Sequence, residues 1–351
     1  MTPLPPHHRA LWSWRRWAVG VAAVGLLAVA VLAERPLLGE SIHSFTHLRY
    51  LPLFWAVVAE FGSMFSLGLL ERQILIMSGH RLSVSRAVAI AYASNAMSQS
   101  LPIVGSGAAT AFTYRRMVSH GAEPTLAGWT LTLAGIASNI AFVVIISIGG
   151  LVSSNTFAIV AGGLGLVLSA LVIVVAAIAV RRAAVRERVG RAAVWVLSRV
   201  QRVIHRPAGD AAAIVGSTMA DLTSFHLHRR DGLHVVGSAF RNWAFDLLCL
   251  AFSISAAGAH VPWWGIVLAW AAGSGGASLN LTPGGLGVVE VALTGALVAL
   301  RVPSTQALTA VLVYRGITFW LAIAIGWPIY WRLSREQPRA AAAPSDEPAK
   351  E

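Results

Sequence analysis

The chain has 351 residues, of which 56% are hydrophobic and only 12% are charged. A soluble domain of this size carries about 25% charged residues to cover its surface, so an ordinary soluble enzyme is excluded. Long uncharged blocks predict an all-α polytopic membrane protein, because about 20 apolar residues suffice to span a bilayer as a helix. The formal net charge of +12 is therefore first a topology signal, since Lys and Arg collect in cytoplasmic loops, and nucleic acid is not needed to explain it.

Metal sites and cofactors are not expected. The chain has one cysteine, Cys249, which lies inside an apolar block and excludes both an intrachain disulfide and a cysteine-based metal site. Three histidines, at positions 226, 228 and 234, have no acidic or cysteine partner close by in the sequence. Residues two apart on a helix also diverge, so we predict neither a metal nor a cofactor.

The first apolar block, Trp17–Ala33, follows a basic N-terminal segment that ends at Arg15 and Arg16. The positive-inside rule places residues 1–16 in the cytoplasm, where their composition predicts disorder. A cleaved signal peptide is the alternative, because Val31 and Ala33 form a passable cleavage site. The second block, Leu51–Leu70, returns the chain to a basic, cytoplasmic loop.

Residues 87–118 predict a re-entrant hairpin that enters from the cytoplasm and returns to it. The first half, 87–101, is about 22 Å long as a helix, which is too short for a hydrocarbon core of about 30 Å. Helix-breaking residues then follow at Pro102, Gly105 and Gly107. Basic residues flank both ends of the segment, which favours a return to the same side.

Five further full-length or broken segments complete the predicted topology. Spans at Pro124–Val152 and Thr156–Val180 lead to an arginine-rich cytoplasmic loop, 181–233, which could also lie on anionic lipid headgroups. A span at His234–Gly258 leads out to a second hairpin, residues 263–300. The last span, Ser304–Trp331, brings a disordered tail, 332–351, into the cytoplasm. The prediction is thus one integral-membrane domain, 17–331, with about six spans and two re-entrant hairpins.

The two hairpins resemble each other in sequence. Each has an asparagine, a proline and two glycines in the same order, followed by a second proline and a long span; the first set is Asn95, Pro102, Gly105, Gly107 and Pro124, and the second is Asn280, Pro283, Gly285, Gly287 and Pro303. Gly284 adds a further hinge to the second hairpin. The topology gives the two units opposite orientation, and inverted repeats with broken helices are typical of secondary transporters. The alternative is that glycine and proline only relieve helix packing.

Charged and polar residues inside these segments are candidates for a substrate site. Each charge costs roughly 2.5–3.5 kcal/mol at a helix centre and therefore needs a partner or a hydrated cavity. Arginine suits bidentate phosphate binding, and the acids could neutralise arginine or a cationic headgroup. The alternative is structural ion pairing of Glu290 with Arg315 and of Arg241 with Asp246. The predicted substrate-binding set is Glu60, Asn95, Gln99, Arg241, Asp246, Glu290, Tyr314 and Arg315.

The segments Leu101–Gly107 and Pro283–Gly287, with Glu290 and the pair Tyr314 and Arg315, resemble the transmembrane region of lysylphosphatidylglycerol synthases. That family includes the multiple peptide resistance factor. In its bifunctional members a cytoplasmic domain transfers lysine from transfer RNA to phosphatidylglycerol, and the membrane part moves the product across the bilayer. The chain ends about 20 residues after the last predicted span, so the resemblance implies the flippase-like part without the transferase domain.

We therefore expect a lipid translocase that moves a phospholipid or polyprenyl-phosphate-type lipid between leaflets, and a transporter rather than an enzyme. Arginine almost replaces lysine, which is typical of a GC-rich bacterial genome, so we place the protein in a bacterial plasma membrane with both termini cytoplasmic. Its expected partners are anionic or phosphate-bearing lipids, with a homo-oligomer left open. Two alternatives remain: a membrane-embedded transferase with Glu60, Asp246 or Glu290 as its base, and a scaffold for a separate soluble synthase.

Overall fold

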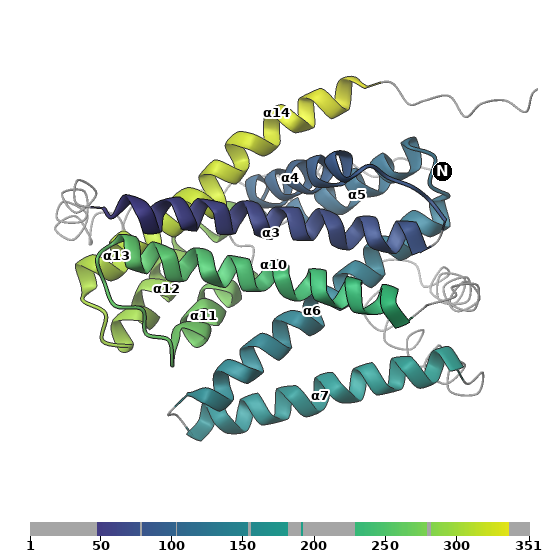
Figure 1. Ribbon diagram of the computed structural model, residues 1–351. Coiled ribbons are helices and arrows are strands. Elements are labelled where there is room, and N and C mark those ends of the chain that lie inside the picture. The colour runs from purple at the N-terminus through teal and green to yellow at the C-terminus, as the bar shows by residue number, and fades with distance from the viewer. Residues whose placement is uncertain are drawn as a thin grey trace, which may run out of the picture. The chain divides into compact units, whose positions relative to one another are not determined.

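The computed structural model describes residues 48–77, 79–102, 104–153, 156–181, 191, 229–278 and 282–336. Every regular element in these ranges is a helix, so the predicted all-α fold is confirmed (Figure 1). Four helices in the described ranges are long and apolar enough to cross a membrane: Tyr50–Met77, Leu126–Val152, Gly232–Ala256 and Ser304–Arg335. The total number of spans and the re-entrant course of the hairpins stay predictions.

The chain divides into two compact units. The first contains Met1–Ser66, Val88–Arg116 and Arg241–Gln337, and the second contains Leu67–Ala87, Met117–Phe240 and Pro338–Glu351. Every charged residue of the predicted substrate site belongs to the first unit, and so do most of both predicted hairpins. The predicted first span, Trp17–Ala33, and most of the basic loop 181–233 lie outside the described residues.

The predicted long spans correspond to helices with slightly different ends. α6 (Pro124–Val152) has the predicted bounds, and α7 (Thr156–Arg181) and α10 (Arg229–Ala256) lie within a few residues of theirs. α3 (Tyr50–Met77) continues past the predicted end at Leu70. The helix contains Gly62 and Gly68 without a break, and it ends shortly before Gly79, whose φ of 83° is left-handed.

The second hairpin consists of α11 (Ile266–Ser278), a short 3₁₀ turn η3 (Pro283–Gly285) and α12 (Val288–Ala299). The 13 and 12 residues of the two helices are about 20 and 18 Å long, too short to cross a bilayer singly. They lie side by side in Figure 1. The chain reverses because Gly284, Gly285 and Gly287 all have positive φ, which other residues rarely adopt.

The first hairpin consists of α4 (Val84–Ser100) and α5 (Gly105–Ser119). The break lies between Ser100 and Gly105 and contains Pro102, as predicted. Gly105 starts α5 directly against the backbone carbonyl of Ser98, where a β-carbon would overlap it. Gly107 lies inside the first turn of α5, and a β-carbon there would meet no described atom within 4 Å, so its role as a hinge stays a prediction.

The last span is one long helical segment with an internal irregularity. α13 (Ser304–Arg315) leads into a π-helical turn, η4 (Gly316–Leu321), which continues as α14 (Ala322–Arg335). π-Helical turns inside α-helices occur frequently at functional sites because they shift the side chains on either side of the inserted residue. This turn begins directly after Arg315. Nothing in the sequence predicted it.

In the second unit, α6 and α7 pack as an antiparallel pair through small residues. A β-carbon on Gly162 would lie 2.5 Å from the Ser147 carbonyl, and one on Gly165 would overlap the Ser147 side chain. Close packing at small residues is how helices associate in lipid, where no hydrophobic force drives them together. The α6 and α7 pair therefore has the contact expected of neighbouring spans.

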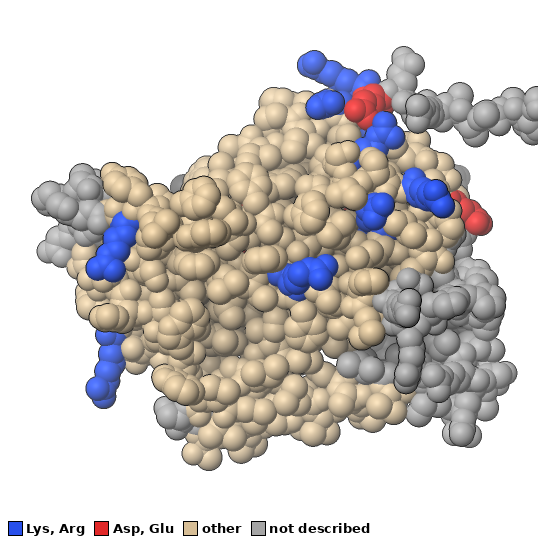
Figure 2. Space-filling model, in the orientation of Figure 1, with Lys and Arg blue, Asp and Glu red and all other residues tan. Residues whose placement is uncertain are grey.

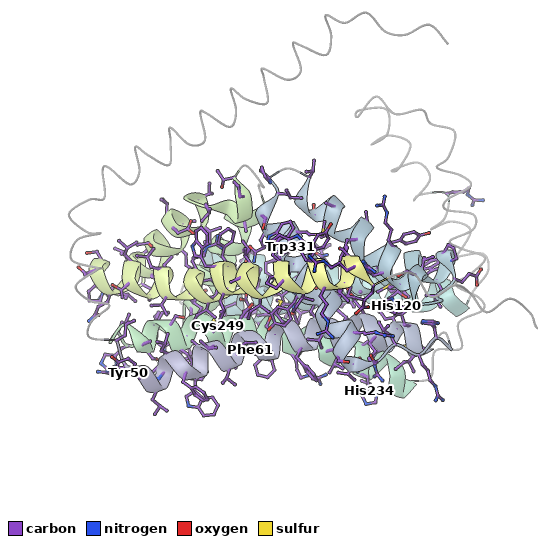
Figure 3. All side chains as sticks on the ribbon, turned by 90° about the horizontal axis from the view of Figure 1, so that it is seen from above. Tyr50, Phe61, His120, His234, Cys249 and Trp331 are labelled. Atoms are coloured by element: carbon purple, nitrogen blue, oxygen red, sulfur yellow. The ribbon has the colours of Figure 1, made fainter. Side chains whose placement is uncertain are left out.

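The surface has the apolar character of a membrane protein. The face drawn in Figure 2 is mostly uncharged, and its Lys and Arg side chains occur at separate places. Large apolar side chains are exposed on α3, where Tyr50 is 79% exposed and Phe61 45% (both labelled in Figure 3), and on α7, where Leu164 is 59% exposed. Contiguous apolar surface of this kind is what lipid contact requires.

Gly326 gives a test of packing in the first unit. Its α-carbon lies so close to the carbonyl of Tyr92 and to Ala96 that a β-carbon would overlap both. We expect Gly326→Ala to lower the unfolding free energy by roughly 1–3 kcal/mol through overpacking, seen as a lower thermal midpoint in detergent. Gly295→Ala on α12 is the matched control, because no atom lies near that glycine, and it should be neutral or slightly stabilising. Equal midpoints for both variants would contradict the packing.

Candidate functional site

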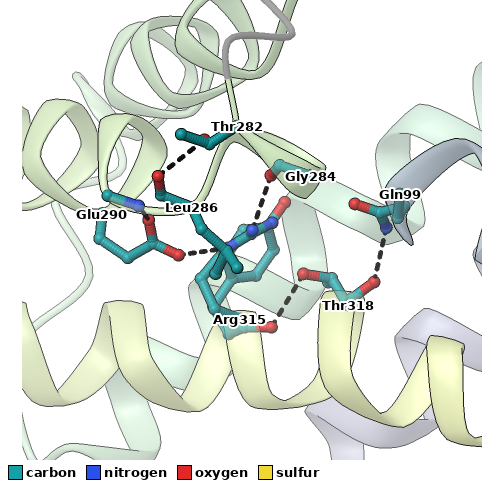
Figure 4. A network of polar contacts seen from close by, with 9 residues as sticks. Gln99, Thr282, Gly284, Leu286, Glu290, Arg315 and Thr318 are labelled. Carbon is teal, nitrogen blue, oxygen red and sulfur yellow. Dashed lines mark hydrogen bonds and ion pairs between the residues drawn. The ribbon is translucent and has the colours of Figure 1, made fainter. Parts of the chain in front are cut away.

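Arg315 is the centre of a buried network in the first unit (Figure 4). It is 6% exposed, and its Nε donates to Oε1 of Glu290 over 2.7 Å. Its Nη2 donates to the carbonyl of Gly284, also over 2.7 Å, and its guanidinium lies 4.6 Å from the centre of the Phe319 ring. One side chain of α13 thus binds both the break of the second hairpin and the helix that follows it.

Glu290 completes the hairpin from the other side. The backbone N–H of Gly287 donates to Oε2 of Glu290 over 2.6 Å, which is the half of a capping box that a glycine N-cap allows. The carboxylate lies in the first turn of α12, where the helix dipole favours negative charge. Both oxygens of Glu290 are therefore engaged, one by the helix end and one by Arg315.

Asp246 on α10 forms a second polar centre. Its Oδ2 accepts a 2.7 Å hydrogen bond from Trp270 Nε1 on α11, and its Oδ1 accepts a 2.9 Å hydrogen bond from the Tyr314 hydroxyl. Tyr314 is the sequence neighbour of Arg315, so consecutive residues of α13 reach the two centres. Arg315 is also close enough for its positive charge to act on Asp246.

Glu60 on α3 lies next to Asp246. It is 5% exposed, and the charges of the two carboxylates act on each other. Tyr92 on α4, 6% exposed, also lies within the field of Glu60. In addition, Ser63 of α3 donates a 3.2 Å hydrogen bond to Asn242 of α10. Ser63 lies one turn from Glu60 and Asn242 one turn from Asp246, so this bond joins the two helices beside the acids.

Asn95 and Gln99 lie on the same face of α4 as Tyr92, since their spacing brings them to one side of a helix. Gln99 Nε2 donates to the carbonyl of Thr318 in the π-helical turn over 3.0 Å. The two hairpin breaks meet here, because a β-carbon on Gly284 would lie 3.1 Å from Oε1 of Gln99. The Nδ2 of Asn95 is buried without a hydrogen bond among the described residues, which marks a polar position without a partner.

The structure thus brings together six of the eight predicted substrate-site residues through the contacts above. They are Glu60, Gln99, Asp246, Glu290, Tyr314 and Arg315. Asn95 shares a helix face with this group. Arg241 is exposed on α10, whereas the carboxylate of Asp246 is bound by Trp270 and Tyr314, so the predicted local pair of Arg241 with Asp246 is not what holds that acid.

Four residues of these centres were missed by the sequence prediction: Tyr92, Trp270, Thr318 and Phe319. Tyr92 could have been found, because it shares a helix face with Asn95 and Gln99. Trp270 gave no signal, since an indole inside an apolar helix reads as lipid or core contact. Thr318 and Phe319 depend on the π-helical turn, which changes the direction of the side chains after Arg315.

Comparison with known families shows which family the chain belongs to. The sequence profile described as the lysylphosphatidylglycerol synthase TM region matches residues 17–326. The chain belongs to this family. No curated protein matches it. The matched range covers α3 to the first part of α14, including both hairpins and the Arg315 network. The protein is therefore a membrane protein of a lipid-related family, as the resemblance implied.

The ion pair gives a direct stability test. Removing one partner of a buried pair costs about 3–5 kcal/mol, because the other charge stays buried without compensation. We expect Glu290→Ala to lower the thermal midpoint strongly. The double variant Glu290→Gln with Arg315→Gln should lower it by less than the sum of the effects of these two substitutions made singly. Glu336→Ala, at the exposed end of α14, is the control and should have no effect. Additive single effects would show that the pair is not coupled.

Proposed function

We propose that the protein moves a lipid with a phosphate-bearing headgroup between the two leaflets of its membrane. The observation that carries this proposal is the position of Arg315: a buried guanidinium in the interior of an apolar helix, at the meeting point of two broken hairpins. Broken helices at such a depth are tolerated only where protein or a hydrated cavity shields the backbone. In transporters these places form the substrate site.

Arg315 keeps donors for a ligand. A guanidinium has five N–H groups, and the described contacts use one on Nε and one on Nη2. No hydrogen bond joins its Nη1 to a described residue. A phosphate oxygen is a charge-assisted acceptor of the geometry that guanidinium favours, so a headgroup can bind on the Nη1 side while Glu290 still holds Nε.

The lipid tails do not need a protein site. The outer faces of α3 and α7 carry exposed Leu, Val and aromatic side chains, so the acyl or prenyl chains can stay in the bilayer while only the headgroup enters the first unit. Moving a charge through hydrocarbon is the costly part of the transfer. In this arrangement the charged headgroup passes through the first unit, where the residues around Arg315 supply polar partners. Phosphatidylglycerol, its lysyl ester and polyprenyl phosphates all carry the required phosphate.

The test is a leaflet-exposure assay in proteoliposomes with fluorescent phosphatidylglycerol, its lysyl ester, a polyprenyl phosphate and a neutral glycolipid. We expect the protein to accelerate at least one phosphate-bearing lipid and not the glycolipid. Arg315→Lys keeps the charge but loses the planar fork, and losing one charge-assisted hydrogen bond of about 1.5–3 kcal/mol lowers the rate roughly 10- to 100-fold.

Arg335→Ala is the matched control, because this arginine is exposed at the end of α14. It should flip lipid at the wild-type rate. Thermal midpoints of all variants establish that they are folded before rates are compared. Folded Arg315→Lys that flips at the wild-type rate would overturn the assignment of Arg315, and no acceleration of any lipid by folded wild-type protein would overturn translocation itself.

A further inference from the structure

Glu60 is a carboxylic acid without the donors that a buried carboxylate needs. It lies in the interior of α3, is 5% exposed, and makes no hydrogen bond to another described residue. The hydroxyl of Tyr92, on a side chain that is 6% exposed, also makes none, and Tyr92 lies within the field of Glu60. Two polar groups from different helices, each on a side chain more than nine-tenths buried, therefore lie in each other's electrostatic field without a hydrogen bond to another described residue.

The neighbouring acid has the opposite environment. Both oxygens of Asp246 accept a hydrogen bond, from Trp270 and Tyr314, and the positive charge of Arg315 acts on it. Hydrogen-bond donors and a nearby cation favour the ionised form of a carboxylate. Of the two acids, Asp246 is therefore the one whose negative charge has hydrogen-bond donors and a cation beside it.

Two adjacent acids with different surroundings separate into an ionised and a proton-carrying member, as acid–base pairs in many sites do. Glu60 receives no hydrogen-bond donor from the described residues, is 5% exposed and has a second acid in its surroundings, and each of these disfavours a negative charge on it. Among the described residues no ion pair joins Glu60 to Arg315, whose ion pair is with Glu290. The remaining way to remove the charge is to bind a proton.

A metal ion fits this place poorly. Hard cations take six to eight oxygen ligands, whereas here both Asp246 oxygens already accept hydrogen bonds. No group of three or more His, Cys, Asp or Glu side chains in the described ranges could hold a metal. A proton needs only the single free carboxylate and the Tyr92 hydroxyl beside it.

We propose that Glu60 is a proton-binding site whose protonation and deprotonation are coupled to lipid translocation. In the step itself the carboxylate binds one proton from water and later releases it to water, and nothing is oxidised or reduced. The coupling rests on the proposed function, because it presupposes lipid translocation. The proton site itself can be detected without transport. A proton that moves with each headgroup would let an electrochemical gradient drive the lipid in one direction.

The titratable groups within electrostatic reach of Glu60 define what can influence it. They come from three elements: Tyr92 on α4, Asp246 and Cys249 on α10, and Tyr314 on α13. Glu71, further along α3 in the second unit, is buried as well and provides a matched control on the same helix.

The first arm of the test is infrared difference spectroscopy of the full chain in liposomes, in which a protonated carboxyl gives its own C=O band. We expect a band at neutral pH that Glu60→Gln abolishes, that Asp246→Asn changes in frequency or intensity, and that Glu71→Gln leaves in place. If Glu60→Gln does not fold, the change produced by Asp246→Asn in the wild-type Glu60 band gives the same answer. No band assignable to Glu60 at any pH at which the protein is folded overturns the proton site.

The second arm measures lipid flipping with and without a pH gradient across the proteoliposome membrane. We expect the gradient to change the wild-type and Glu71→Gln rates, and the Glu60→Gln rate to be the same with and without the gradient. If the Glu60 band is present but the wild-type protein flips lipid at the same rate with and without the gradient, the coupling is overturned. A Glu60 band in folded protein that flips no lipid overturns the proposed function while the proton site stands, so the two failures are distinguishable.

Discussion

The contact between Arg315 and the second hairpin is the interaction on which the rest of the first unit depends. The turn between α11 and α12 exposes backbone groups that cannot be left unpaired away from water. Arg315 supplies a donor to the Gly284 carbonyl and binds Glu290, which in turn accepts from the Gly287 N–H. A single guanidinium thus satisfies the break, neutralises the acid that caps α12 and attaches both to α13.

The same helix connects the two polar centres. Tyr314 donates to Asp246, and Arg315 binds Glu290, so neighbouring residues of α13 reach different acids. The π-helical turn that follows places the Thr318 carbonyl against Gln99 of the first hairpin and Phe319 against the Arg315 guanidinium. A movement of α13 at this turn would therefore alter the contacts of Arg315 and the donors of Asp246 together, which is what coupling between the two centres requires.

Much of this arrangement follows from local sequence rules, and the remainder depends on contacts between distant segments. Proline and glycine at Pro102 and Pro283–Gly287 predicted both breaks, because their backbone preferences act within a few residues. Gly107 lies inside α5 rather than at the break, as glycine is also frequent within membrane helices. The partners Trp270 and Gly284 could not be predicted for Asp246 and Arg315, since they lie 24 and 31 residues away and no periodicity connects them.

The way Arg315 is held also bears on how a transport cycle can proceed. If Glu290 used all the N–H groups of the Arg315 guanidinium, a phosphate could bind only by breaking the ion pair. The turn of the second hairpin would then lose its hydrogen-bond donor at the same time. Here Glu290 uses Nε alone and Gly284 uses Nη2, while Nη1 has no described partner. Headgroup binding and hairpin support can therefore occur together. In the proposed function, the free energy of headgroup binding is then available to move the helices. None of it is needed to replace a lost hydrogen bond at the turn between α11 and α12.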